Sequence, residues 1–143
     1  MSLIITGSNT VLEAMKVNRK IHELYVLKGT NREVLAEAYK RKITVKELDK
    51  QGIINVLPPA NQGIGALVED YKYLSIEDAL KKTNKPKLFL MLDQLEDPHN
   101  LGAILRSADA FSVDGIIIPK NRSVHLKSTV AKVSTGAIEH VDV

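Results

Sequence analysis

One stretch in the carboxy-terminal half, residues 87–119, constrains the fold more than any other part of this sequence. It begins with a short apolar run at 87–92, which is typical of a strand buried on both faces of a parallel sheet. A polar loop follows at 93–100, and apolar residues then recur at helical spacing over 101–111. A second apolar run, 115–118, ends at a proline. This order predicts a strand, a loop, a helix and a second strand.

Asn100 and Arg106 are the polar side chains of this stretch that are best placed for chemistry. Two strands joined through a helix form a right-handed crossover in a parallel sheet, and ligands bind outside the carboxyl ends of such strands. The loop and the start of the helix occupy that end, where Asn100 is placed to cap the helix. Residue spacing alone also allows an ordinary connection, in which Asn100 is only a cap and Arg106 pairs with Asp109.

Three motifs follow one another in this half of the chain: DPHNLGAILRSADAF at 97–111, IPKNRS at 118–123 and AKVSTGA at 131–137. Together they resemble the first motif region of the SpoU (TrmH-type) RNA ribose 2′-O-methyltransferases, a family of the knotted SPOUT class. Ser112 departs from the pattern, because the family usually has glycine there. The resemblance implies a chain that stops before the later family motifs, which complete the knot and form most of the S-adenosylmethionine pocket.

The amino-terminal half carries three further segments: ITGSNTV at 5–11, LYVLKG at 24–29 and NQGI at 61–64. They resemble the substrate-binding domain that precedes the catalytic domain in RlmB-like members of the same family. Asn61 departs from the pattern, since histidine is common there. The resemblance therefore covers nearly the whole chain.

Two domains are expected, both of the α/β class. The patterns predict a small α/β sandwich over residues 1–83. The resemblance implies that this domain binds the RNA substrate and that residues 84–143 form the incomplete first part of a parallel-sheet α/β knot (SPOUT) domain. A linker is expected at 83–86, where apolar periodicity lapses and a proline stops the preceding helix. In the first domain, the patterns predict helices that begin at Thr10, Asn31, Thr44 and Ser75, and strands over 23–27, 53–57 and 63–68.

The resemblance implies a reaction, the transfer of a methyl group from S-adenosylmethionine to a ribose 2′-hydroxyl of a guanosine in 23S ribosomal RNA. Asn100 and Arg106 match the residues that the family uses for catalysis. The family's arginine has been proposed as a general base, but a guanidinium keeps its proton, so we favour Arg106 as a bidentate clamp on the neighbouring phosphate. Asn100 would orient Arg106 or the ribose. A transfer RNA substrate, or an RNA-binding fragment without activity, is the alternative.

Charge gives a second indication of an anionic partner. The formal net charge is +3, and the excess of Lys and Arg lies in the first 96 residues. Clusters such as those at 19–20 and 40–42 can follow a phosphate backbone, although a run of charge is usually only a solvated surface. A turn at 58–63 is a second candidate, with an ordinary surface loop as its alternative. The residues expected to contact RNA are Lys40, Arg41, Lys42, Asn61, Gln62, Arg122 and Ser123.

Composition excludes several classes of protein. The chain has no cysteine, so disulfides and thiolate catalysis are excluded. Its histidines are scattered without ligand spacing, so no metal site is expected, and no stretch is long enough to cross a bilayer. Because no secretory signal is visible, we expect a cytoplasmic protein. An unrelated metabolite enzyme is the other alternative, but no nucleotide-binding glycine loop or nucleophile elbow supports it.

The resemblance also implies a homodimer, in which subunits pack through small residues of the helix that carries Arg106. Core packing within one subunit explains the same small residues equally well. These residues are Gly102, Ala103, Ser107 and Ala110.

Overall fold

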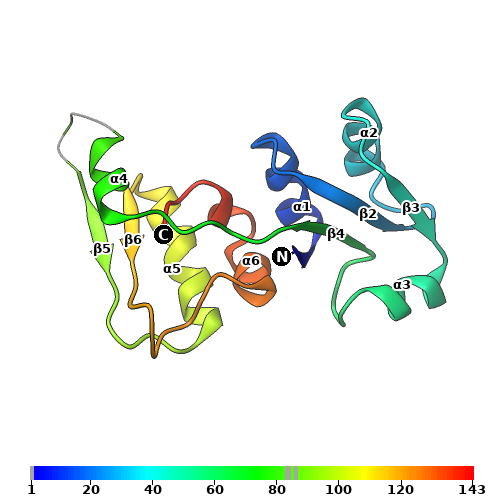
Figure 1. Cartoon of the computed structure of the whole chain (residues 1–143). Helices are drawn as coiled ribbons and strands as arrows, with labels where there is room; N and C mark the ends of the chain where they lie inside the picture. The colour runs from blue at the N-terminus through cyan, green and yellow to red at the C-terminus, as the bar shows by residue number, and fades with distance from the viewer. Residues whose placement is uncertain (1, 83–84, 86) are drawn as a thin grey trace. The chain divides into compact units, whose positions relative to one another are not determined.

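The computed structural model describes residues 2–82, 85 and 87–143 (Figure 1). Helices and strands alternate along this part of the chain, so the α/β class expected from the sequence is confirmed. Of the linker predicted at 83–86, Lys85 is described and the other three residues lie outside the described residues.

The chain divides into two compact units, Met1–Asp70 and Tyr71–Val143. The segment 71–82, which we expected in the first domain, belongs to the second unit. Its backbone is bonded there, because the Leu74 N–H donates to the Val143 carbonyl (2.9 Å). The division therefore lies before the expected boundary.

The first unit is built on one mixed four-stranded sheet. Its described elements are β1 (Ser2–Thr6), α1 (Ser8–Lys16), β2 (Ile21–Leu27), α2 (Arg32–Lys40), β3 (Val45–Leu48), α3 (Lys50–Val56) and β4 (Ile64–Glu69). The strand order is β1–β4–β2–β3, with β4 antiparallel to β1 and β2, and β3 parallel to β2. α1 and α2 pack on each other and contact the sheet. The largest fully buried side chains of this core include Ile5, Met15, Leu24 and Ile64.

Residues 45–48 form a strand, so the helix predicted to begin at Thr44 was wrong. The TVKE pattern fits a capping box, which is a local signal. In the structure Val45 lies beside Leu24 of β2, and the Leu24 N–H donates to the Thr44 carbonyl (2.9 Å). Because pairing with a neighbouring strand supplies several hydrogen bonds, it outweighs one capping interaction.

The apolar run at 53–57 lies mainly on α3, so the strand predicted there was wrong. The Asp49 carboxylate accepts a backbone hydrogen bond (2.7 Å) and caps the first turn of this helix. Ile53 and Leu57, four residues apart, are buried, whereas Ile54 is 58% exposed. A run this short shows no period that separates a helix from a strand.

The first strand, β1, was not predicted from the sequence. It pairs antiparallel with β4 along its whole length. α1 begins at Ser8, after Gly7, rather than at the predicted Thr10. The predictions that the structure confirms in this part of the chain are the helices that follow Asn31 and Ser75 and the strands at 23–27 and 63–68.

The second unit contains a two-stranded parallel sheet, β5 and β6, whose strands are joined through α5. Its described elements are α4 (Ile76–Lys81), β5 (Phe89–Met91), α5 (Pro98–Ala110), β6 (Gly115–Ile117), α6 (Ser128–Ser134) and the 3₁₀ helix η1 (Ala137–Glu139). The predicted order of strand, loop, helix and strand is confirmed. The predicted burial of the first strand was wrong, since Leu88 is 56% and Met91 75% exposed.

Close packing of α5 on α6 depends on Gly102. A Cβ atom at this position would lie 2.6 Å from the Cβ of Val133 and 3.1 Å from the backbone nitrogen of Ser134. Gly102, one of the four small residues expected at a subunit interface, therefore packs within the chain. The other three are exposed.

The G102A variant should be destabilised, because the added methyl group clashes with α6. Overpacking costs about 1–3 kcal/mol, which is more than the roughly 1 kcal/mol that alanine gains over glycine inside a helix. Urea denaturation followed by circular dichroism measures the difference. The control is S107A on the exposed face of α5, whose free energy of unfolding should change by less than about 0.5 kcal/mol. A G102A protein as stable as the unchanged chain would contradict the packing argument.

Candidate functional site

The loops that leave the carboxyl ends of β5 and β6 are bonded to each other. These carboxyl-end loops comprise residues 92–97 and 118–127. The Val124 N–H donates to the Leu95 carbonyl (2.7 Å), and the Ser123 hydroxyl donates to the same carbonyl (3.3 Å). The loops are therefore held together at the end of the sheet where parallel strands commonly bind ligands.

α5 begins at the end of the first of these loops, and Asp97 caps it. The Asp97 carboxylate accepts a hydrogen bond from the His99 N–H (2.9 Å), and Pro98 occupies the first helical position, where no N–H is needed. The prediction that Asn100 caps the helix was wrong, because the helix begins before this residue. Asn100 lies in the first turn and is exposed.

Arg106 presents an exposed guanidinium on α5. Within the described part of the chain it has no ion pair, so the alternative pairing with Asp109 is not formed. Asn100 and Arg106 are six residues apart, which in an α-helix is about 9 Å along the axis and about 120° around it. They face different directions and share no hydrogen bond in the described residues. His99, two turns before Arg106, lies on the same side of the helix.

The second carboxyl-end loop carries several cations. Arg122 has a φ of 54°, in the left-handed region, and its side chain is exposed. Lys120 and Lys127 are also exposed. Ser123 differs, since it is half-buried and its hydroxyl is bonded to the first loop. An exposed arginine between two lysines can bind phosphate groups.

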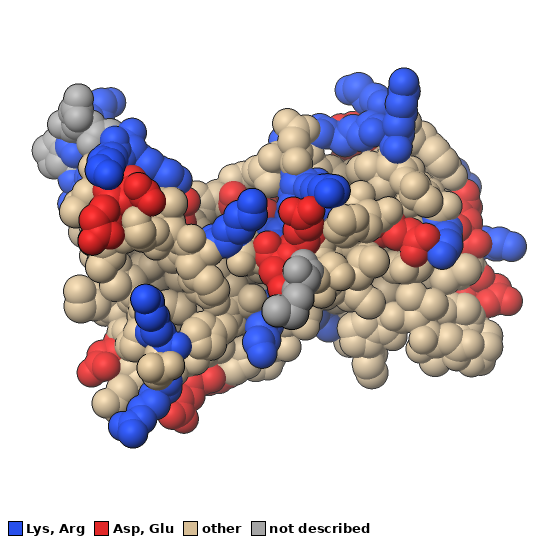
Figure 2. All heavy atoms as spheres, in the orientation of Figure 1, with Lys and Arg blue, Asp and Glu red and all other residues tan. Residues whose placement is uncertain are grey.

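Two basic clusters of the first unit meet where α1 and α2 end. Arg41 Nη1 donates to Asn18 Oδ1 (2.6 Å), so the residues after α1 contact the residues after α2. Figure 2 shows Lys and Arg side chains gathered over α2. We call this surface the basic end of the first unit, and it comprises Arg19, Lys20, Lys40, Arg41 and Lys42.

Some cations of the basic end are bonded within the unit, and others are exposed without an ion pair in the described residues. Arg41 Nε donates to Glu37 Oε1 (2.5 Å), and this bond holds the pKa of the Glu37 carboxyl below its usual value. Arg19 and Lys20 are likewise bonded within the unit. Lys40 and Lys42 are exposed and have no ion pair among the described residues. These two lysines are the members available to an anionic partner.

Asn61 and Gln62 lie in a turn whose side-chain amides bond within the protein. Asn61 Nδ2 donates to the Pro58 carbonyl (2.8 Å), and its Oδ1 accepts from the Gly63 N–H (2.8 Å). Gln62 Oε1 accepts from the Ser8 N–H (3.1 Å) at the start of α1. The Asn61 amide therefore holds the shape of the turn, and the Gln62 amide connects the turn to the start of α1.

A polar cluster beside this turn was missed from the sequence. Ser8 Oγ donates to Asn31 Oδ1 (2.6 Å), and Asn31 Nδ2 lies 3.4 Å from the Gln62 carbonyl that accepts from it. Asn31 stands before α2 with a φ of 51°, yet its side chain makes no capping bond. The available signal was the polar residues that follow Gly7 and Gly29 directly after two strands.

The basic end and the polar cluster lie at opposite ends of α1 and α2. Ser8 and Asn31 stand at the starts of the two helices, whereas Asn18 and Arg41 follow their last turns. Each helix has nine residues, which is about 13 Å at 1.5 Å per residue. The RNA contacts predicted at residues 40–42 and at the turn therefore belong to separate surfaces.

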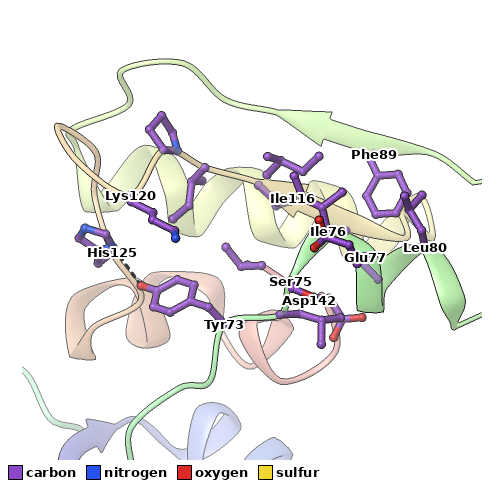
Figure 3. Close-up of a pocket in the computed structure, with 17 residues that line it drawn as sticks. Tyr73, Ser75, Ile76, Glu77, Leu80, Phe89, Ile116, Lys120, His125 and Asp142 are labelled. Carbon is purple, nitrogen blue, oxygen red and sulfur yellow. Dashed lines mark hydrogen bonds between the residues drawn. The ribbon is translucent and has the colours of Figure 1, made fainter.

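A cavity of about 570 Å³ lies against β6 and α4 in the second unit (Figure 3). Its lining is mainly apolar, and Tyr73, Lys120 and His125 lie toward one end of it in the figure. A second cavity of about 310 Å³ in the same unit adjoins the first, since Ala79 and Asp142 line both. Neither cavity is lined by Asn100 or Arg106.

The described residues include neither a metal-binding cluster nor a membrane-spanning helix. No group of three or more His, Cys, Asp or Glu side chains there could hold a metal ion. None of the helices described has both the length and the apolar character needed to cross a membrane.

Known families match both units. The SpoU rRNA Methylase family matches residues 87–143, and the RNA 2′-O ribose methyltransferase substrate binding family matches residues 4–74. A TrmH family tRNA/rRNA methyltransferase of Bacillus subtilis is 42% identical over 97% of the chain, and one of Staphylococcus aureus is 43% identical over 98%. The chain spans 59% of the length of each of these relatives.

Solved structures share the fold of the chain. An rRNA methyltransferase from Sinorhizobium meliloti has a TM-score of 0.77 at 24% sequence identity. The match covers 99% of this chain and 53% of the Sinorhizobium chain. The SpoU methyltransferase AviRb from Streptomyces viridochromogenes, in complex with S-adenosylmethionine, has a TM-score of 0.79 at 17% identity, with coverages of 99% and 54%. At these identities the likeness establishes the fold, an α/β fold with a parallel sheet as in SpoU methyltransferases.

The D97A variant should be less stable, because the cap of α5 is lost. Removal of an N-cap side chain costs about 0.5–2 kcal/mol. The matched N100A variant alters an exposed residue of the same first turn and should change the free energy of unfolding by less than about 0.5 kcal/mol. Chemical denaturation of the three proteins measures both values. Equal losses in the two variants would contradict the assignment of the cap to Asp97.

Proposed function

Because the chain belongs to the SpoU (TrmH) family of RNA methyltransferases, we propose that it takes part in methyl transfer from S-adenosylmethionine to a ribose 2′-hydroxyl of RNA. The target we propose is a guanosine of 23S ribosomal RNA. The two family matches, to residues 4–74 and 87–143, support a division into a part that binds the RNA and a part that begins the methyltransferase domain. Since the chain spans 59% of its relatives, the activity is proposed for the whole protein.

The exposed guanidinium of Arg106 is the observation that carries this proposal. It lies on the helix that begins where the carboxyl-end loops are bonded together. A guanidinium keeps its proton, so it is a poor general base. Its planar fork can instead hold a phosphate in bidentate fashion next to the target ribose. In this role Arg106 fixes the ribose in place and stabilises negative charge that develops on the 2′-oxygen.

Asn100 is proposed to contact the ribose rather than Arg106. Its amide is exposed in the first turn of α5 and shares no hydrogen bond with Arg106 in the described part of the chain. An amide can donate to one hydroxyl and accept from another, which suits the two oxygens of a ribose edge. The two side chains would then bind different parts of one nucleotide.

S-adenosylmethionine is the methyl donor of the family, and the AviRb structure contains it. Neither of the two cavities described above in this unit is lined by Asn100 or Arg106. We therefore assign no cofactor-binding residue. This observation favours a second candidate function, in which the chain by itself binds RNA without catalysing methylation.

The RNA contacts are proposed to come from cations that the protein leaves without ion pairs in the described residues. Lys40 and Lys42 supply them at the basic end, and Arg122 at the second carboxyl-end loop. An exposed cation gains by binding a phosphate and loses no internal bond in doing so. Arg41 and Ser123 are proposed to support these surfaces through the hydrogen bonds that they already make. Asn61 and Gln62 are proposed to shape the turn, a separate surface for RNA, through their own hydrogen bonds.

A cytoplasmic homodimer is proposed as the working form of the whole protein. The family resemblance implies it, and three small residues on α5 are exposed rather than used in the core of the unit. The exposed small residues are Ala103, Ser107 and Ala110.

Product analysis tests the reaction. The chain alone, and the chain fused to the part of the B. subtilis relative that the match does not cover, are incubated with bacterial RNA and labelled S-adenosylmethionine. Digestion to nucleosides and mass spectrometry should reveal 2′-O-methylguanosine in ribosomal RNA for the fusion and no product for the chain alone. A methylated base would contradict the ribose assignment, and methylated transfer RNA would support the alternative substrate.

Salt dependence of binding tests the basic end. Each phosphate contact contributes about 0.7–0.9 to the slope of log K against log salt, so K40A/K42A should lower that slope by about 1.5. Fluorescence anisotropy of a labelled ribosomal RNA fragment at several salt concentrations measures it. The K81A control removes an exposed lysine of α4 and should leave the slope unchanged. An unchanged slope in K40A/K42A would place the contacts elsewhere.

The R106K variant of the active fusion tests the bidentate clamp. Lysine keeps the charge but loses the planar fork, so turnover should fall about a hundredfold, the usual loss when a stabilising donor is removed. Initial rates of methyl transfer measure this change. R32K, an exposed arginine at the start of α2, is the matched control and should keep full activity. Near-normal turnover of R106K would refute the clamp.

A further inference from the structure

Tyr73 bonds to the second carboxyl-end loop from the segment before α4. Its hydroxyl accepts a hydrogen bond from the Leu126 N–H (2.8 Å) and lies 3.2 Å from His125 Nδ1. The rings of Tyr73 and His125 also meet edge to face, with centroids 5.9 Å apart and planes at 84° (Figure 3). One side chain thus makes three contacts with two consecutive residues of the loop.

The same loop holds Arg122 in a conformation that needs support. Its φ of 54° lies in the left-handed region, which is unfavourable for a residue with a side chain. Residues 119–127 belong to no helix or strand, so regular backbone bonding does not hold this conformation. Support comes from two anchors. The first loop holds one side, because the Leu95 carbonyl accepts from the Val124 N–H and the Ser123 hydroxyl, and Tyr73 holds the other by accepting from the Leu126 N–H.

We infer that Tyr73 is a positioning residue that directs Arg122 toward an RNA phosphate. With the Tyr73 anchor lost, the loop is held on one side only, and Arg122 can relax to an ordinary φ that turns its side chain in another direction. This inference rests on the proposed function, in which Arg122 contacts RNA. It adds a residue that lies outside every motif that carried the family resemblance.

Tyr71, two residues earlier, provides a matched control. Its hydroxyl donates to Glu139 Oε1 (2.9 Å) at η1. Phenylalanine at either position removes one hydroxyl and keeps the ring. A difference between Y73F and Y71F therefore reports the loop contacts and not the loss of a tyrosine hydroxyl in general.

RNA binding by the full 143-residue chain tests the inference. Anisotropy of a labelled ribosomal RNA fragment should show that Y73F binds about three- to tenfold more weakly, the range expected for one neutral hydrogen bond. Y71F should bind as tightly as the unchanged chain. Amide hydrogen exchange of Leu126 should be faster in Y73F, because its N–H loses its acceptor.

The double variant Y73F/R122A shows whether Tyr73 acts through Arg122. If it does, adding Y73F to R122A causes no further loss of RNA affinity, since the side chain being positioned is already absent. General damage to the second unit would instead weaken the double variant beyond R122A alone. That result would overturn the inference.

Other outcomes separate this inference from the proposed function. Full RNA affinity in Y73F, with weakened binding by R122A, would overturn the inference and leave the proposed RNA contact standing. Full RNA affinity in R122A would overturn both the inference about Tyr73 and the proposed RNA contact of Arg122. Equal losses in Y73F and Y71F would overturn the inference, because the effect would not be specific to the loop.

Discussion

The packing of α5 onto α6 at Gly102 is the constraint from which the arrangement of the second unit follows. Leu101 and Leu105 are fully buried on one face of α5, so the opposite face must point to solvent. Arg106 lies on that exposed face, and the cap at Asp97 starts the helix where the loops after β5 and β6 are bonded together. Turning the helix by one residue would carry the guanidinium toward the core, where an unpaired charge is costly. The same contact that stabilises the unit therefore keeps the arginine available.

In the first unit, hydrogen bonding decides which polar groups remain available to a partner. Arg41 is bonded to Glu37 and to Asn18, and so joins the ends of two helices. Its neighbours Lys40 and Lys42 have no ion pair among the described residues. Within one run of three cations, the middle one therefore holds the structure and the flanking ones face solvent. Exposed ion pairs of this kind add little stability, so their main effect here is to set geometry.

Local sequence patterns predicted the secondary structure correctly where a helix or strand could be recognised without its neighbours. The helix of the second unit has a clear helical period and lies between two apolar runs, so the order of strand, helix and strand was recognised. Ser75 caps α4 as its sequence suggests, with its hydroxyl accepting from the Asp78 N–H (3.1 Å). Short segments were assigned wrongly. Val45 lies in a strand because β2 is beside it, and Ile53 lies on a helix that an upstream carboxylate caps. In both cases the residues that decide the structure, β2 for Val45 and Asp49 for Ile53, lie outside the short sequence pattern.

The sequence by itself determined the α/β class, the family resemblance and the choice of Asn100 and Arg106 as candidate catalytic residues. All three depend on residue types and their order along the chain. Only the tertiary structure decided that Asn100 does not cap α5, that the predicted RNA contacts of the first unit lie on two surfaces, and that Tyr73 bonds to the loop of Arg122. The physical reason is that each of these facts depends on a hydrogen bond or a helix start set by three-dimensional packing. Spacing along the chain records which groups are present, but not which of them are already bonded to one another.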